Sequence, residues 1–185
     1  MDRKFNREKA IKAIEDLLDA LGEDRTREGL TDTPRRVADA FAEFTSGEGK
    51  SAKEHLSKTF KAKCGEIVIE RDIEFSSTCE HHLMPFFGKI AIAYIPDGRV
   101  VGLSKLARTV EVFSKRLQLQ ERLTSDIAAE IMRCLSPKGV MVVCEAEHTC
   151  MTCRGVKKPG SKTLSYSVEG CFHEDRKREV LSLLK

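Results

Sequence analysis

Apolar residues recur at the spacing of one helical face near the start of the chain. The run comprises Ile11, Ile14, Leu17, Leu18 and Leu21. Asn6 can cap the start of such a helix, and Gly22 follows its end. We therefore predict an amphipathic helix between these two residues.

A second helix is predicted from Thr33 to Phe44, because a capping residue is followed at once by Pro34, which suits the first turn of a helix. The next segment, residues 45–58, is polar and contains glycine, so we expect a loop. Residues 1–58 then form an N-terminal helical arm with its connecting loop.

The remaining residues, 59–185, are expected to form one catalytic body with a different pattern. Segments rich in Ile, Val and aromatic residues, with partial alternation, predict strands at residues 66–75, 87–95, 140–151 and 163–169. Helical spacing predicts one helix opening at Ser104, another ending before Pro137, and a short charged helix at the end of the chain. This order favours an α+β fold, with an antiparallel four-stranded sheet and helices on one face. The free edges of such a sheet favour oligomerisation.

Composition narrows the functional class. The formal net charge of the 185 residues is only +3, and basic and acidic residues are interleaved, which argues against a nucleic-acid partner. No apolar run has the length of a membrane span, and the start of the chain is not a signal peptide, so we expect a cytoplasmic protein without a membrane partner. Seven cysteines, an odd number, favour free thiols or metal ligation over disulfides.

Two cysteine- and histidine-bearing segments suggest a metal site. Cys79 and His82 have the spacing C-x-x-H, a weak signal alone, because such a pair is about as often a buried thiol beside a surface histidine. Alternation along the strand from residue 140 predicts that His148 and Cys150 extend its apolar face. Thiolate and imidazole ligands from two segments suit Zn²⁺ best among common metals.

Cys153 leaves two forms of this site open. With Cys79, His82 and Cys150 it would complete a closed structural Cys₃His site. Strand geometry instead sends Cys153 to the face opposite Cys150, and we favour this open site, although the argument fails if the strand ends before Met151. An open zinc site lowers the pKa of bound water to about 7 and so favours hydrolysis. His81 and His148 would then be proton carriers or, alternatively, packing groups beside the ligands.

Polar residues elsewhere suit a nucleotide. Ser104, Lys105 and Arg108 lie around a predicted helix start, which favours a phosphate, although alone this would be an ordinary helix start with solvated charges. Arg154 follows Cys150 closely and is a good phosphate partner. Glu121 has a carboxylate that can accept two hydrogen bonds from guanine, but from these residues alone a helix-terminal Glu stabilised by the helix dipole or paired with Arg122 is the stronger interpretation.

Four motifs in the same order resemble those of the GTP cyclohydrolase I family. They are Cys79-Glu80-His81-His82, the segment from Gly102 to Arg108, the segment from Gln118 to Thr124, and the segment from His148 to Gly155. The resemblance extends from about Thr33 to the end of the chain. It implies the tunnelling fold, a decamer of two stacked pentamers, and active sites between subunits. It also implies conversion of GTP and water into formate and 7,8-dihydroneopterin triphosphate, the entry to folate and pterin synthesis.

The resemblance also assigns roles to matching positions of this sequence. Cys79, His82 and Cys150 would bind Zn²⁺, while His148 and His81 would move protons. The residues that would bind the substrate are Glu121 and Gln120 at guanine, and Ser104, Lys105, Arg108, Arg154 and Arg36 around the ribose and triphosphate. Two alternatives are a non-catalytic zinc-stabilised oligomer that binds nucleotide, and a related tunnelling-fold enzyme acting on another purine or pterin.

Overall fold

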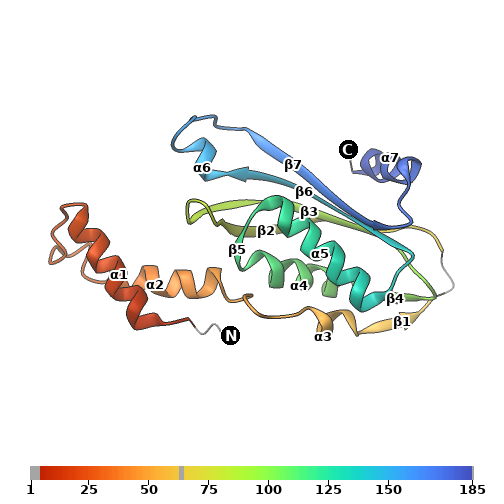
Figure 1. The fold of residues 1–185 in the computed structure, drawn as a ribbon, viewed down its shortest axis with the longest axis horizontal. Helices are drawn as coiled ribbons and strands as arrows, with labels where there is room; N and C mark the ends of the chain where they lie inside the picture. The colour runs from red at the N-terminus through yellow and green to blue at the C-terminus, as the bar shows by residue number, and fades with distance from the viewer. Residues whose placement is uncertain (1–4, 63–64, 185) are drawn as a thin grey trace.

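A computed structural model describes residues 5–62 and 65–184 of the chain. The two helices predicted near the start are present. Helix α1 (Arg7–Ala20) begins after Asn6, whose side chain accepts a hydrogen bond from the Lys9 amide at 2.9 Å, and helix α2 (Thr33–Phe44) carries proline in its first turn. The two helices pack against each other and project away from the rest of the molecule (Figure 1).

The segment predicted to be a loop contains a short helix, α3 (Lys53–Leu56). Its apolar residue Leu56 and the preceding Ala52 are completely buried against the body. The Ser51 hydroxyl and the Ala52 amide donate hydrogen bonds of 2.7 and 2.9 Å to the Glu130 carboxylate. The polar composition of this segment concealed the few apolar residues that fix it in place.

Gly47 brings the same segment into close contact with the body. Its amide donates to the Lys115 carbonyl at 2.8 Å, and a Cβ atom at this position would lie 2.1 Å from the Val112 carbonyl oxygen. Arg116 donates to the carbonyls of Gly47 and Lys50 at 3.1 and 2.7 Å. Only glycine permits this approach, so the connection to the arm is attached to the body at a defined place.

The main sheet has five strands in the order β5-β2-β3-β6-β7. The four predicted strands are antiparallel neighbours within it: β2 (Val68–Cys79), β3 (Met84–Ile95), β6 (Gly139–His148) and β7 (Lys162–Gly170). A short strand that we did not predict, β5 (Leu117–Gln118), runs parallel to the end of β2. A separate two-stranded sheet, β1 (Thr59–Lys61) with β4 (Arg99–Val101), was also missed, because strands of two or three residues are too short to show alternation.

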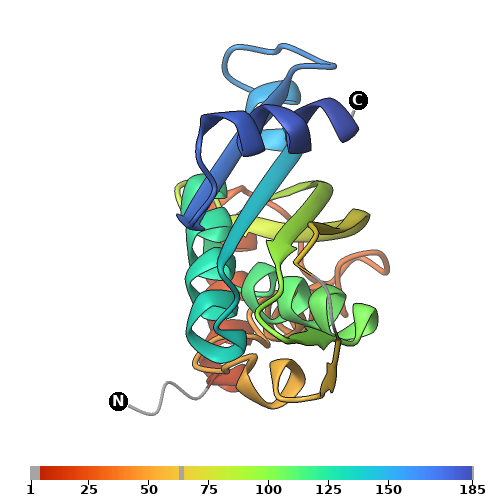
Figure 2. The same ribbon diagram turned by 90° about the vertical axis from the view of Figure 1, so that its right-hand side faces the viewer.

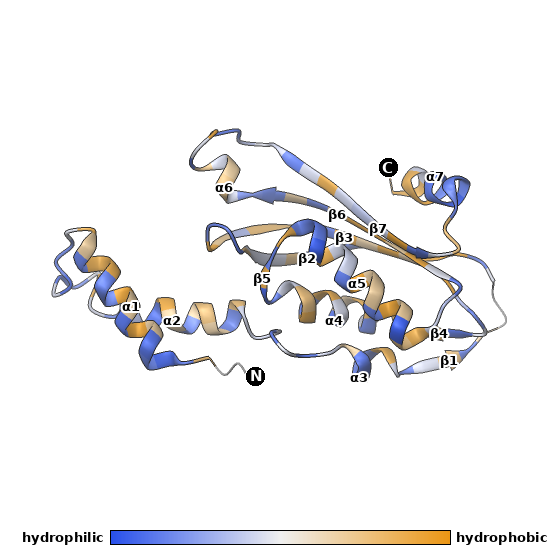
Figure 3. Ribbon diagram, in the orientation of Figure 1, coloured by the Kyte–Doolittle hydropathy of each residue, from blue (hydrophilic) through white to orange (hydrophobic). Residues whose placement is uncertain are grey.

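Helices cover both faces of the sheet rather than one (Figure 2). Helices α4 (Leu103–Ser114) and α5 (Gln120–Leu135) enclose the larger core with one face of β2, β3 and β6. Helix α7 (Glu174–Leu183) packs on the opposite face, where its Val180 joins a smaller cluster of apolar residues that includes Phe172 and Met141. The prediction of helices on one face is therefore wrong, because the charged sequence of α7 concealed its short apolar contact. Figure 3 shows that apolar positions recur along α4 and α5, and the buried ones, which include Leu106, Val110 and Ile127, belong to the larger core.

Strand β6 ends at His148, and the chain continues into the short helix α6 (Thr149–Thr152). The prediction that this strand extends to Met151 is wrong, and the argument that used it to separate Cys150 from Cys153 fails. Within the described part of the chain, no helix is long and apolar enough to cross a lipid bilayer.

Candidate metal centre and surrounding site

A tight hairpin connects β2 and β3 and carries two of the predicted ligands. Cys79 is the last residue of β2 and pairs with Met84 of β3. The amides of His82 and Leu83 both point to the Cys79 carbonyl, at 3.3 and 2.8 Å, and Leu83 has a φ angle of +54°, which is uncommon for a branched side chain. This turn places the Cys79 Sγ atom 3.6 Å from the His82 Nδ1 atom.

Strand register brings Cys150 to the same hairpin. Phe86 of β3 pairs with His148, the last residue of β6, so α6 begins beside the start of β3. The Thr149 hydroxyl then donates a hydrogen bond of 2.6 Å to the Pro85 carbonyl and fixes the first turn of α6. Although 71 positions separate Cys79 from Cys150, the two lie in one cluster because of this pairing.

Three ligand atoms, one each from Cys79, His82 and Cys150, lie within 4.8 Å of one another. Cys79 is buried, His82 is exposed and Cys150 lies between these extremes. Cys153 is not a member of this group: its exposed thiol donates a hydrogen bond of 2.8 Å to the Thr149 carbonyl. The described geometry therefore has the three ligands of the open form, although the reason is the orientation of the Cys153 side chain directly after α6 and not strand alternation.

The chemistry of the three donors fits Zn²⁺. Two sulfurs and one imidazole nitrogen form a ligand set found in catalytic zinc sites, where a fourth position stays open. Burial and the nearby Cys79 thiol raise the pKa of Cys150. A bound cation would counteract both effects, because it stabilises thiolates. All six cysteines of the described residues are free, and Cys64 lies outside those residues.

Arg122 connects the ligand hairpin to helix α5. Its guanidinium forms an ion pair with Glu80, which lies between the ligands in the hairpin, and donates to the Leu117 carbonyl at 2.8 Å and to Gln118 Oε1 at 3.0 Å. Arg122 therefore pairs with Glu80, not with Glu121 as the simpler interpretation of the sequence held. The hydrogen bond and charge of Arg122 lower the pKa of Glu80. We did not predict this connection, and the only signal was that both residues fall within the family motifs.

His148 lies beside the cluster on the buried side of β6. Its ring stacks on Phe86 with centroids 4.5 Å apart and an interplanar angle of 4°. Its Nε2 atom lies 2.8 Å from Gln120 Oε1. Burial lowers the pKa of His148, while the charge of Glu121 acts in the opposite direction.

Three other predicted residues lie around the same end of the sheet. Glu121 is exposed in the first turn of α5, directly after Gln120. His81 is exposed in the hairpin, with its ring edge-on to that of His82. Arg154 is exposed after α6, close enough to Cys150 for its charge to oppose the rise in that pKa. The end of the sheet thus gathers the ligands, His148 and the proposed guanine-binding residues.

Two of the residues predicted to bind phosphate, Ser104 and Lys105, lie toward the end of the body that is far from the metal cluster. From its pairing with Cys79, β3 runs 12 residues to Ile95, a length of about 36 Å. Helix α4 starts shortly afterwards and returns toward β5, so Ser104 and Lys105 are in the turn farthest from the metal cluster. Arg36 lies on the arm, where it forms an ion pair with Asp32 at 3.2 Å. One chain therefore does not bring Ser104 and Lys105 to its own metal cluster, whereas Arg154 lies near it.

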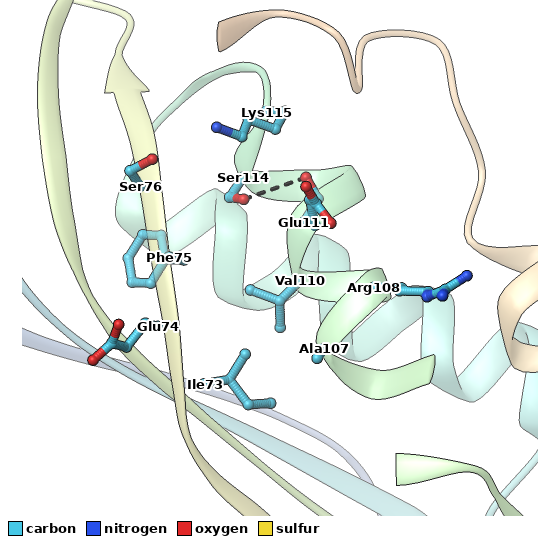
Figure 4. A pocket seen from close by; sticks show the side chains of 10 residues that line it. All are labelled: Ile73, Glu74, Phe75, Ser76, Ala107, Arg108, Val110, Glu111, Ser114 and Lys115. Atoms are coloured by element: carbon cyan, nitrogen blue, oxygen red, sulfur yellow. Dashed lines mark hydrogen bonds between the residues drawn. The ribbon is translucent and has the colours of Figure 1, made fainter. Parts of the chain in front are cut away.

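Arg108 borders a cavity of about 380 Å³ between α4 and the edge of β2 (Figure 4). Ile73 and Phe75 of β2 form the apolar side of this cavity, and Arg108 and Lys115 are among the charged residues around it. In the described pairing, β5 covers the edge of β2 only at Thr78 and Cys79. The neighbouring part of this edge is thus open to another chain.

Comparison with known proteins identifies the family. The model of the GTP cyclohydrolase I family matches residues 10–185. The chain belongs to the GTP cyclohydrolase I family. A protein named GTP cyclohydrolase 1 from Clostridium perfringens is 56% identical over 182 residues, which cover 97% of this chain and 98% of that protein. Another of the same name, from Streptococcus pyogenes, is 57% identical over 183 residues, covering 97% and 94%.

Among solved structures, the crystal structure of the archaeosine synthase QueF-Like in the apo form matches 56% of this chain and 93% of its own, at 19% identity and a TM-score of 0.45. The family match and the two relatives confirm the resemblance seen in the four motifs, and with it the predicted enzyme class.

Proposed function

We propose that this chain converts GTP and water into formate and 7,8-dihydroneopterin triphosphate, as a zinc-dependent GTP cyclohydrolase I. The observation that carries the proposal is the convergence of Cys79, His82 and Cys150 next to His148 and Glu121, in a chain of this family. In the reaction the imidazole ring of guanine opens at C8, formate leaves, and the ribose opens and rearranges before the pterin ring closes. Each stage moves protons, so a neutral histidine beside the reacting atoms is needed.

Cys79, His82 and Cys150 would hold Zn²⁺, which when bound lowers the pKa of water to about 7 and supplies a nucleophile for hydrolysis. Hydrogen bonding between Arg122 and Glu80 holds the hairpin that carries two of these ligands. His148 is the proton carrier supported by position, and His81 in the exposed hairpin is a second candidate.

Glu121 is our candidate for recognition of guanine, because its carboxylate can accept parallel hydrogen bonds from N1–H and the 2-amino group. Gln120 would support this side of the site from the adjacent position. Arg154 would contact the ribose or triphosphate from the same chain, since it lies near Cys150.

Ser104, Lys105, Arg108 and Arg36 would reach the triphosphate from neighbouring chains. The support is the placement of Ser104 and Lys105 far from the metal cluster of their own chain, together with the part of the β2 edge that no described strand covers. Chains joined at such edges would form the tunnelling fold, with a decamer of two pentamers and a division between arm and catalytic body near residue 58. We further propose a cytoplasmic enzyme at the entry to folate or pterin synthesis.

The direct test is to incubate zinc-loaded protein with GTP and to measure released formate, together with fluorescent pterin after oxidation. We expect both products in equal amounts. A fully metallated protein that binds GTP but releases neither product would reject the enzyme and favour a nucleotide-binding oligomer without turnover.

A further inference from the structure

Gln120 is the first residue of α5 and has one of the most buried polar side chains of the described residues, with 2% of its surface exposed. Strand β5 delivers it to the interior, because Leu117 and Gln118 pair with the end of β2 immediately before it. A glutamine amide has two N–H donors and one acceptor oxygen, and each needs a partner when buried. The partners of Gln120 therefore determine how its amide is oriented.

Three acceptors surround the amide nitrogen of Gln120. Nε2 lies 3.1 Å from the Cys144 carbonyl oxygen, 3.0 Å from the Thr163 carbonyl oxygen and 3.0 Å from Ser165 Oγ. If the amide were reversed, its oxygen would face two carbonyl oxygens in the interior, with no hydrogen between them. The orientation with Nε2 toward β6 and β7 is therefore required.

This orientation leaves Gln120 Oε1 facing His148 Nε2 at 2.8 Å. An amide oxygen only accepts hydrogen bonds, so the hydrogen in this contact belongs to His148 Nε2. In a neutral imidazole the other nitrogen, Nδ1, then carries the lone pair. Stacking on Phe86, at 4.5 Å and 4°, fixes the plane of the same ring.

We propose that Gln120 is a positioning residue that holds the His148 ring with its hydrogen on Nε2, so that Nδ1 is the nitrogen that faces the proton to be moved. The Gln120 Nε2 atom donates hydrogen bonds to β6 and β7, and its Oε1 atom accepts one from His148, so the position of these strands determines the orientation of the imidazole. No hydrogen bond joins His148 Nδ1 to another described residue, so this nitrogen is not committed to the fold.

The inference rests on the proposed function only for its catalytic consequence. If His148 moves protons during turnover, the nitrogen that does so must be unprotonated and correctly aimed at the start, and loss of such alignment typically costs about 100-fold in rate. The inference also separates two roles for Gln120. Its side chain serves His148, because both of its N–H groups and one lone pair of its oxygen are already engaged within the chain.

The first experiment uses the wild-type, metal-loaded protein without GTP. Nitrogen NMR of protein labelled at its five histidines reports which ring nitrogen carries hydrogen, and the signal missing in His148→Gln identifies residue 148. We expect His148 as the Nε2–H form. A ring protonated at Nδ1 alone overturns the proposal, and this result does not depend on whether the protein turns over GTP.

The second experiment compares Gln120→Met with Ser165→Ala. Methionine keeps the length of the side chain but offers no oxygen to His148, so we expect kcat to fall about 10- to 100-fold with KM for GTP changed less than about threefold. Ser165→Ala removes one acceptor but leaves both carbonyls to orient the amide, so His148 should remain the Nε2–H form. A raised KM with unchanged kcat in Gln120→Met would instead assign the amide to substrate binding and overturn the proposal.

A different result would show that the proposed function, and not the role of Gln120, is wrong. If wild-type protein shows the Nε2–H form but releases no formate, the hydrogen-bonded arrangement stands and the activity is wrong. If Gln120→Met does not fold, the wild-type spectrum still decides the proposal.

Discussion

At the scale of single residues, the site depends on side chains whose partners are determined by a few hydrogen bonds. Cys153 shows this clearly, since it lies only three positions from the ligand Cys150 and directly follows α6. Its thiol donates a hydrogen bond to the Thr149 carbonyl and is not a member of the ligand group. The open form of the metal cluster thus depends on where this thiol is held.

Replacing Cys153 by alanine tests this directly. Because its thiol does not join the cluster, we expect Cys153→Ala to keep the zinc content and formate release of the parent protein within about twofold. Cys150→Ala is the matched comparison, and it should lose zinc. A parallel loss of zinc in both variants would establish the closed site.

Replacing His148 by alanine separates proton transfer from ligation. His148 lies outside the ligand group, so His148→Ala should retain zinc but lose about 10²- to 10⁴-fold in formate release. Metal content and turnover measured on the same sample decide the result. Loss of metal together with activity would contradict the assignment of His148.

At the scale of elements, two close contacts position the site: the pairing of β3 with β6 and the attachment of the arm connection to α5. Sequence patterns located both strands but did not predict how closely their backbones approach each other. Gly88 of β3 shows why, because a Cβ there would lie 2.0 Å from the Glu145 carbonyl oxygen and 2.7 Å from Ala146 Cα. This glycine allows the two strands to approach closely near the site.

Gly88→Ala should therefore destabilise the body. The added methyl group must displace backbone atoms of β6, which we expect to lower the free energy of unfolding by about 1–3 kcal/mol, measured by urea denaturation. Gly29→Ala is a suitable control, because its Cβ would meet only a flexible arginine side chain at 3.4 Å. Equal free energies of unfolding for the two variants would show that the backbone of β6 can shift to accommodate the methyl group without loss of stability.

Glu130 gives the attachment of the connecting segment a dependence on pH. Burial tends to raise the pKa of this carboxyl, but hydrogen bonds from Ser51 and Arg133 outweigh burial and lower the pKa overall. A lowered pKa in the folded state means that the ionised group stabilises the protein above its unfolded pKa of about 4.3, and that this contribution is lost as pH falls through the folded value.

We expect Glu130→Gln to lower the free energy of unfolding by about 1.5–3 kcal/mol at neutral pH, because charged hydrogen bonds to buried groups are lost. The difference from the parent should shrink below about pH 4, where the parent carboxyl also becomes protonated. Thermal unfolding at several pH values measures this difference. The exposed Glu28→Gln should change stability by less than about 0.5 kcal/mol, and a difference for Glu130→Gln that stays constant from neutral to acid pH would contradict the role of its charge.

At the scale of the whole molecule, we propose that the active site is divided between chains. The metal cluster and the start of α4 lie at opposite ends of the body, and the arm that carries Arg36 projects from the body on the side of the β2–β3 hairpin (Figure 1). A folded single chain would therefore contain two incomplete halves of a GTP site, which only association with other copies could join.

Complementation between two inactive variants tests this division. Cys150→Ala removes a ligand from one half of the site and Lys105→Ala removes a phosphate contact from the other, so each alone should be nearly inactive. In mixed oligomers assembled from equal amounts of both, about a quarter of the sites should receive two intact halves and recover turnover. A chain carrying both substitutions should show no recovery, and equal inactivity of the mixture would place the whole site within one chain.

The sequence predicted local features better than those that depend on contacts between segments. Periodicity located α1, α2, α5 and all four long strands, because each has an apolar face of sufficient length. Strands β1, β4 and β5 were missed, since their stability comes from partners far along the chain. The ligands were found from residue type and spacing, whereas the pairing of Arg122 with Glu80 depends on the unpredicted β5.

Because Cys79 and Cys150 are far apart in the sequence, a metal ion in this cluster would also be a structural cross-link. A metal ion bound by both sulfurs would close a long loop that contains most of the body. Such a cross-link reduces the conformational entropy of the unfolded chain. Metal binding and the stability of the surrounding sheet would thus be linked, so removal of the metal would lower the stability of the fold as well as the activity.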